Sequence, residues 1–454
     1  MNDADAGFFF LGQRPNCNVA MVMFAVLPER VPYEDMLEEL WGASKFVPRF
    51  LDRLQPAPLG LAPPIWVPAD PFQPRDQLRD HPLPPGATWD DALAVVDALQ
   101  STPFPLDRPP WEIVQVTGCP DGRALFVMKV HHSLSDGTAL SLLFAKAFGR
   151  AFLEQSGIEV EAVSEPPPAA SPTRIALAYK GKALKEWMRH ARSSLPALSR
   201  DPEARRRERI AVDALARPRH RQPASSFGTT RRLSGFRIPL EAWNNEAAAR
   251  GGSANDLYLA IVANAMHLRF PQWDYDSMPL ELVMPVNIRE DGVQDGGNVT
   301  GVSVVELDGR AQHLDDLAEV RRRTTEAKRD AQDASPTLVG GLVGLLPGRL
   351  RGALQYREFA ARDAVATNVP VPIPGELCGV PFETMFMVAP SIGTSVSFSL
   401  TSYQDSLQVA ANVDPAAVPG GLDAEITQTL EAVFGKVESL RDGTLTGPSA
   451  SFAS

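Results

Sequence analysis

The sequence predicts an α/β (α+β) fold of two subdomains, and three observations support this prediction. Short apolar runs rich in β-branched and aromatic residues alternate with segments whose apolar residues recur at helical spacing. The 454 residues are enough for two ordinary domains with sizeable cores. A Pro- and Arg-rich stretch separates two halves that share this alternation. We therefore expect an N-terminal subdomain in residues 1–155, a crossover linker in 156–230 and a C-terminal subdomain in 231–454.

The first half is expected to form a sheet flanked by helices. Its predicted strands lie at 19–26, 111–117 and 124–130, and its predicted helices at 34–52 and 89–100. The sequence Cys-Pro-Asp-Gly at 119–122 is typical of a turn, so the last two strands should form a hairpin. Residues 55–88 are rich in proline and predict loops with short extended pieces.

The linker and the second half show the same two periodicities. A basic helix is predicted at 176–195, with Leu177, Leu184, Trp187 and Met188 on one side, and residues 200–226 are expected to be mobile in part. Further strands are predicted at 236–238, 280–285, 298–307, 384–387, 395–402 and 407–412, and helices at 240–250, 254–269, 313–332 and 423–440. The apolar stretch 337–354 contains five glycines. It is expected to be a buried helix with close neighbours, and membrane insertion is the alternative.

The candidate catalytic feature is a pair of histidines, His131 and His132, at the end of the 124–130 strand. Adjacent residues of a strand point to opposite faces, so one imidazole is free to act while the other braces the turn. Imidazole is the side chain best matched to moving a proton near neutral pH. Asp136 and Gly137 then break the strand, and apolar residues at helical spacing follow over 138–152. At the start of that helix, Asp136 is expected to fix the turn rather than to touch substrate.

Other interpretations of this segment are a metal site, a serine nucleophile and a purely structural histidine pair. A metal site needs ligands that converge, whereas neighbouring strand residues diverge, so no metal is expected. Turn or capping roles are favoured for Ser133 and Ser135 over nucleophilic ones. The chain has no GxSxG, no GxGxxG after a strand, no P-loop and no HExxH.

The segment HHSLSDG fits the HHxxxDG motif of the acyltransferase superfamily that includes chloramphenicol acetyltransferase, carnitine acyltransferases and peptide-synthetase condensation domains. From about residue 4 to residue 436 the chain resembles the bacterial wax ester synthase/diacylglycerol acyltransferase family of that superfamily. Five further blocks carry the resemblance in order: Asp5-Ala6-Gly7-Phe8-Phe9; Pro109-Pro110-Trp111, with Pro for Leu; Asn255-Asp256; Pro285-Val286-Asn287-Ile288-Arg289, followed by Gly297-Asn298; and Thr367-Asn368-Val369-Pro370-Val371-Pro372, with Thr for Ser and Val for Gly. The departures bear on acyl or alcohol selectivity.

The resemblance implies two chloramphenicol-acetyltransferase-like subdomains that face each other across a substrate tunnel. It also implies transfer of a long acyl chain from acyl-CoA, a co-substrate, to diacylglycerol or a long-chain alcohol, with no bound cofactor and no covalent intermediate. His132 would be the general base, supported by His131 and Asp136. Gly137 and Arg289 would support the turn, with Arg289 paired to Asp136.

Four further residues are candidates for substrate or oxyanion contacts: Asn255, Asp256, Asn368 and Trp111. Each has a structural alternative, namely helix capping for the Asn-Asp pair, the start of a Pro-rich loop for Asn368, and the start of a strand for Trp111. Two other functions remain open. One is a condensation-like acyltransferase that esterifies a polyketide, sugar or carrier-bound acceptor. The other is a non-catalytic lipid-binding or lipid-droplet protein.

Composition and charge bear on where the protein works. No stretch of about 18 apolar residues is present, the acidic N-terminus does not resemble a signal peptide, and three widely spaced cysteines favour a reducing compartment. Residues 171–232 hold 16 Lys or Arg against five Asp or Glu, whereas the whole chain carries a net charge of −11. An anionic membrane or lipid droplet, the phosphates of CoA or the protein's own acidic body are candidate partners of this basic stretch. We expect a cytoplasmic protein that associates peripherally with the inner membrane or lipid droplets, with no nucleic-acid partner.

Overall fold

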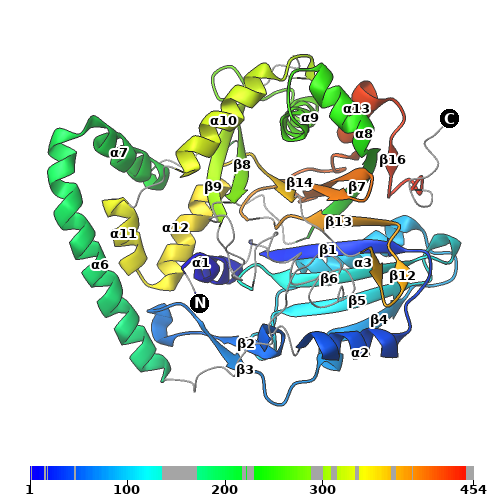
Figure 1. Cartoon of the computed structure of the whole chain (residues 1–454), viewed down its shortest axis with the longest axis horizontal. Coiled ribbons are helices and arrows are strands. Elements are labelled where there is room, and N and C mark those ends of the chain that lie inside the picture. The colour runs from blue at the N-terminus through cyan, green and yellow to red at the C-terminus, as the bar shows by residue number, and fades with distance from the viewer. Residues whose placement is uncertain are drawn as a thin grey trace.

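The computed structural model describes residues 1, 3–14, 17, 19–44, 48–134, 171–216, 221, 230–287, 300–307, 314–332, 337–369, 375–390 and 392–445. Within these ranges the chain forms two main β-sheets with helices packed around them, so the predicted α/β class with two sheet-containing subdomains is confirmed (Figure 1).

The first sheet has the strand order β13-β1-β6-β5-β4. Its strands are β1 (Ala20–Leu27), β4 (Leu78–Pro82), β5 (Trp111–Thr117), β6 (Ala124–His131) and β13 (Thr384–Val388). The helix α3 (Trp89–Ser101) packs on one face and α2 (Tyr33–Ser44) on the other. Both faces of β1 and β6 are buried, which explains why β1 is apolar throughout and why β6 is apolar except for Lys129 and His131. Beside this sheet lie α1 (Asp3–Gly12) and the small hairpin of β2 (Asp52–Gln55) and β3 (Ile65–Pro68).

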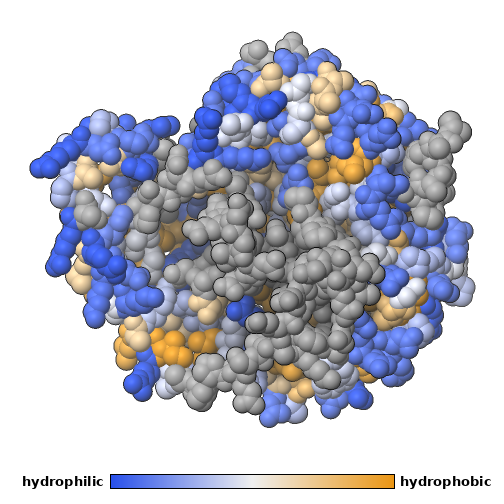
Figure 2. All heavy atoms as spheres, in the orientation of Figure 1, coloured by the Kyte–Doolittle hydropathy of each residue, from blue (hydrophilic) through white to orange (hydrophobic). Residues whose placement is uncertain are grey.

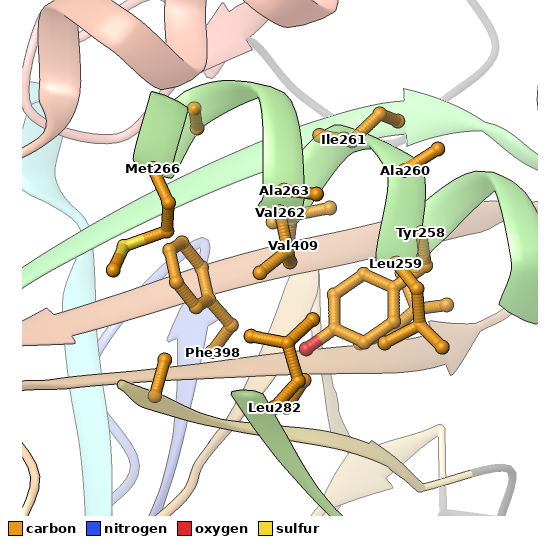
Figure 3. Close-up of a cluster of buried hydrophobic side chains, with 14 of the residues drawn as sticks. Tyr258, Leu259, Ala260, Ile261, Val262, Ala263, Met266, Leu282, Phe398 and Val409 are labelled. Carbon is orange, nitrogen blue, oxygen red and sulfur yellow. The ribbon is translucent and has the colours of Figure 1, made fainter. Parts of the chain in front are cut away.

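The second sheet has the strand order β16-β7-β15-β14-β10-β8-β9. Its strands are β7 (Arg232–Pro239), β8 (Leu280–Asn287), β9 (Thr300–Leu307), β10 (Ala364–Val369), β14 (Val396–Tyr403), β15 (Ser406–Val413) and β16 (Glu438–Ser439). Its helices are α8 (Leu240–Ala249), α9 (Ala254–Arg269), α10 (Ala318–Gln332) and α13 (Asp423–Phe434). Figure 3 shows the core between α9 and the sheet, where Tyr258, Val262 and Met266 lie over Leu282 and Phe398. A small hairpin of β11 (Glu376–Leu377) and β12 (Val380–Pro381) precedes β13.

The two halves of the chain are interleaved. The strand β13 comes from residues 231–454, yet it pairs antiparallel with β1 of the first sheet, from Val22 opposite Val388 to Val26 opposite Thr384. Next to this pairing, Arg123 and Glu383 form an ion pair of 2.8 Å whose side chains are both largely buried. The first sheet therefore cannot be completed by residues 1–155 alone.

The outer part of the molecule at the left of Figure 1 is formed by α6 (Pro172–Arg200), α7 (Pro202–Ala216) and α11 (Leu338–Leu345). The helix α12 (Gly348–Ala360) lies between them and α1. Residues 202–216 are helical, contrary to the expectation of a partly mobile segment. Pro202 stands at the first helical position, where proline is tolerated, and the Ala-, Arg- and Glu-rich sequence after it favours a helix. None of the described helices is long and apolar enough to cross a bilayer.

Three other expectations about the second half need correction. Pro347 splits the apolar stretch into α11 and α12, and every residue of α11 remains at least partly exposed, so it is not one buried helix. Residues 364–369 form the interior strand β10, which the sequence analysis missed because its run Ala-Val-Ala-Thr-Asn-Val is short and weakly apolar. The last helix ends at Gly435, whose positive φ of 76° terminates it before the predicted residue 440.

Candidate active site

Backbone hydrogen bonds fix both histidines at the end of β6. The His131 N–H donates to Pro110 O at 2.9 Å on the β5 side, and the His132 N–H donates to Val19 O at 3.0 Å on the β1 side. The Leu134 N–H then donates to His131 O at 2.9 Å and closes a turn. Because consecutive N–H groups of an interior strand bond to opposite neighbours, this register also sends the two imidazoles to opposite faces.

His131 is buried and acts as a hydrogen-bond acceptor. Its Nδ1 atom accepts the backbone N–H of Ser133 at 3.1 Å and lies 2.7 Å from Ser133 Oγ. The ring of Phe104 meets the imidazole edge-on at 5.5 Å. Burial is the main cause that lowers the pKa of His131 to about 3, and electrostatic repulsion by the neighbouring His132 and Lys129 adds to it. The imidazole is therefore neutral at pH 7, and the donor to Nδ1 leaves the ring proton on Nε2.

His132 lies in a different environment. It is only half-buried, and its ring stacks on Phe8 of α1 with centroids 3.7 Å apart and an angle of 12° between the planes. Its Nδ1 atom is buried. The sequence analysis grouped Phe8 only with a family block, because no periodicity links residue 8 to residue 132.

A cavity of about 350 Å³ opens on the His131 side of the site. Its apolar wall includes Phe9, Leu54 and Phe104, and its polar lining includes Arg14, Arg108 and Arg231. This volume falls within the range of small-molecule sites, which are commonly apolar with a few polar groups. The cavity has the chemical character needed to hold an apolar group next to side chains that attract anions.

The four other candidates fall into two groups. Asn368 of β10 donates through Nδ2 to Oδ1 of Asn255 at the start of α9, at 3.2 Å, so the structure brings these two together. Asn368 lies in a strand and does not begin a loop. The described hydrogen bonds of this pair lie within the second subdomain and do not reach the histidines.

Asp256 and Trp111 have structural environments. The carboxylate of Asp256 accepts from the N–H and the hydroxyl of Ser253 at 2.8 and 2.7 Å, which completes the cap of α9, and it also accepts from Thr324 Oγ1 at 2.9 Å. Trp111 is fully buried, and its indole N–H donates to Phe50 O at 2.9 Å. This placement favours a role in the core over substrate contact.

Asp136, Gly137 and Arg289 lie outside the described residues, as does the helix expected at 138–152. The pairing of Arg289 with Asp136 therefore stays a prediction. Among the residues that the structure does describe, no three His, Cys, Asp or Glu side chains gather in an arrangement that would hold a metal ion.

The buried His131 generates a prediction about pH and stability. Below the ordinary histidine pKa of about 6.5, the unfolded chain binds a proton that the folded chain does not take up until about pH 3. Stability is therefore lost as the pH falls through 6.5. At pH 5 this site alone should cost the wild type about 2 kcal/mol relative to pH 8.

His131→Asn removes the imidazole that binds this proton, and the amide oxygen of Asn can still accept a hydrogen bond. In urea unfolding, the variant should be less stable than the wild type at pH 8, and the gap should shrink by about 2 kcal/mol at pH 5. A gap that stays the same at both pH values would show that His131 does not titrate differently in the folded chain.

The chain is similar to known proteins along most of its length. The model described as the wax ester synthase/diacylglycerol acyltransferase catalytic domain matches residues 1–258, and the model of the WS/DGAT C-terminal domain matches residues 296–432. Two Mycobacterium tuberculosis proteins that are provisionally named diacylglycerol O-acyltransferases are similar to the chain. One is 25% identical over 437 residues, which cover 88% of this chain and 84% of that protein. The other is 28% identical over 406 residues, which cover 83% of each.

Solved structures share the fold. The wax ester synthase/diacylglycerol acyltransferase from Marinobacter aquaeolei VT8 superimposes with a TM-score of 0.60 at 18% identity, covering 95% of this chain and 98% of that one. The first condensation domain of the CDA synthetase gives a TM-score of 0.59 at 18% identity, covering 97% of each chain. The protein is an acyltransferase. The two family models together span most of the sequence, and the chain belongs to the wax ester synthase/diacylglycerol acyltransferase family.

Proposed function

We propose that this acyltransferase moves a long acyl chain from acyl-CoA to the hydroxyl group of diacylglycerol or a long-chain alcohol, with His132 as the general base. The observation that carries the assignment is the contrast between the two adjacent imidazoles. His131 is buried and its pKa is lowered to about 3, which makes it a weak base at neutral pH. His132 is half-buried and faces away from that site, so it is the histidine suited to meet a hydroxyl group.

The proposed reaction needs one proton carrier and two substrates bound together. Because Nδ1 of His132 is buried, we assign Nε2 as the atom that takes the hydroxyl proton. The alcohol oxygen attacks the thioester carbonyl, the tetrahedral adduct collapses with cleavage of the C–S bond, and the imidazolium returns its proton to the CoA thiolate. Holding both substrates side by side makes a covalent acyl-enzyme unnecessary. Asn255 is our candidate oxyanion donor, and the bond that it accepts from Asn368 would orient it.

The cavity lies on the His131 side, so we propose that it holds a remote part of a fatty substrate rather than the reacting carbonyl. Phe9, Leu54 and Phe104 give it an apolar wall, while Arg14 and Arg108 would favour the anionic groups of CoA. A condensation-like reaction on a polar acceptor shares this geometry, since it uses the same base and a similar thioester. The acceptor panel below separates the two reactions.

We further propose that α6 brings the enzyme to an anionic lipid surface. Leu177, Leu184, Met188 and Leu195 are separated by seven, four and seven residues, so they form one line along the helix, and all four are exposed. Lys182, Lys185, Arg189 and Arg192 are exposed on the adjoining side. An apolar line beside a basic face suits a helix that lies in a membrane interface. Figure 2 shows apolar surface over the lower end of α6 and mostly hydrophilic surface along the rest of the helix in this view.

Trp187 of α6 differs from the sequence expectation, and Lys180 of the same helix is also held by α11. Trp187 does not share the exposed side with Leu177, because its ring covers Gly341 of α11 and its N–H donates to Leu338 O at 3.2 Å. Lys180 donates to the carbonyls of Leu345 and Leu346 at 2.8 and 3.0 Å, so it holds the end of α11. Both residues therefore stabilise the attachment of α11 to α6 and are excluded from the proposed lipid contact.

The catalytic proposal predicts that His132→Ala lowers acyl transfer by at least about 10²-fold, because a general base contributes that much or more. Thermal unfolding should show a fold that is close to wild type. Labelled palmitoyl-CoA would be offered with diacylglycerol, hexadecanol and polar acceptors, and the products would be separated by polarity. If His132→Ala kept most of its activity and His131→Asn lost its activity, His131 rather than His132 would be the general base. Products formed only with polar acceptors would favour the condensation-like reaction, and no product with any acceptor would favour a non-catalytic lipid-binding protein.

The docking proposal predicts binding to phosphatidylglycerol vesicles at low salt and release at high salt, because salt screens the attraction over about 10 Å at 0.1 M. Changing Lys182, Lys185, Arg189 and Arg192 to Gln should abolish flotation with these vesicles, since each charge contributes about 1 kcal/mol near an anionic surface. The matched control changes four exposed basic residues of α10, Arg321, Arg322, Lys328 and Arg329, to Gln and should float like the wild type. Equal loss in both variants, or equal binding to neutral vesicles, would rule out α6 as the electrostatic contact.

A further inference from the structure

The ring of Phe8 covers one face of the His132 imidazole. The centroid distance of 3.7 Å and the interplanar angle of 12° describe a parallel stack rather than an incidental edge contact. A stack that is centred in this way covers the imidazole face and leaves the ring edge, where the nitrogens lie, available for in-plane hydrogen bonds. Phe8 therefore constrains the plane of His132 without covering its edge.

The position of Phe8 is set by a close contact between two helices that lie far apart in the sequence, α1 and α12. A Cβ atom at Gly352 of α12 would lie 2.9 Å from Phe10 O of α1, and one at Gly348 would lie 2.1 Å from the Phe10 ring. Arg351 of α12 lies over the same ring at 5.3 Å. The two glycines let α1 approach α12 closely. Phe8 is two residues before Phe10 and therefore points to nearly the opposite side of α1, where it meets His132.

The face of an aromatic ring carries partial negative charge and attracts a cation placed over it within about 6 Å. When His132 takes the hydroxyl proton, positive charge develops on a ring that is held directly over this face. The same contact is weaker while the imidazole is neutral. An interaction that strengthens as charge develops lowers the barrier rather than only tightening binding.

We propose that Phe8 is a positioning residue for the reaction, which holds the plane of His132 and stabilises its imidazolium form through the ring face. This inference rests on the proposed role of His132 as the general base. The inference gives the Asp-Ala-Gly-Phe-Phe block at the start of the chain a role in the reaction. Phe8 itself would contact neither the acyl group nor the proton that is transferred.

Steady-state kinetics with palmitoyl-CoA and hexadecanol test the proposal. Phe8→Leu keeps an apolar side chain and removes the ring face, so kcat should fall about tenfold while KM for both substrates stays within twofold. Phe8→Tyr keeps the face and should restore most of kcat. Replacing Phe8 by 3,4,5-trifluorophenylalanine keeps the shape but withdraws charge from the face, and kcat should again fall severalfold.

Matched variants separate this role from general destabilisation. Phe270 stacks on Trp273 at 4.2 Å and 4° in the second subdomain, so Phe270→Leu removes a comparable stack remote from β6 and should leave kcat unchanged. Gly352→Ala should push α1 away from α12 and lower kcat, whereas Gly344→Ala, with nothing within 4 Å of the added methyl group, should not.

The outcomes also separate this inference from the proposed function. An active wild type, an inactive His132→Ala and a fully active Phe8→Leu would overturn the role of Phe8 alone. A rise in KM at constant kcat would mean that Phe8 contacts substrate instead, and a trifluoro variant with normal kcat would overturn the stabilisation of the imidazolium. Full activity of His132→Ala would remove the proposed function, whatever the Phe8 variants show.

Discussion

The register of β6 between β1 and β5 is the constraint on which the site depends. One histidine donates its N–H to Pro110 O and the next donates to Val19 O, so both backbone positions are fixed by neighbouring segments. Since successive side chains of a strand diverge, a pair of identical residues acquires two different environments. His131 enters a buried pocket where Ser133 occupies its Nδ1, and His132 meets the ring of Phe8. A slip of one residue would exchange these environments and place the buried, weakly basic imidazole on the opposite face.

The same site also depends on the second half of the chain. The strand β13 extends the first sheet next to β1, and α12 holds α1 through contacts that only glycine permits at two positions. Arg441 adds another link, because it donates to Asp97 of α3 at 3.1 Å and to Leu233 O of β7 at 2.6 Å. The region around the site is therefore assembled from both halves of the chain. This explains how a helix at the N-terminus and a helix near residue 350 jointly position one imidazole.

Local sequence signals predicted much of this fold. The strand Trp111–Thr117 and the helix Ala254–Arg269 have the predicted bounds, because turn residues and a capping serine mark their ends clearly. Structural features that depend on packing between segments far apart in the sequence could not be predicted in this way. The stretch 364–369 is a strand because β8 and β14 flank it, and Trp187 faces α11 rather than solvent because Gly341 leaves room for its ring. The contact of Phe8 with His132 belongs to the same class, since only the assembled helices bring residues 8 and 132 together.

In the proposed reaction the acyl group passes directly between two bound substrates while His132 carries the proton. The most direct test mixes stoichiometric enzyme with labelled palmitoyl-CoA in the absence of any acceptor, and follows CoA release together with the intact mass of the protein. Direct transfer predicts no stoichiometric burst of CoA and no added mass, followed by rapid ester formation when hexadecanol is supplied. Release of one equivalent of CoA together with a protein that carries one acyl group would contradict it and would require a covalent route.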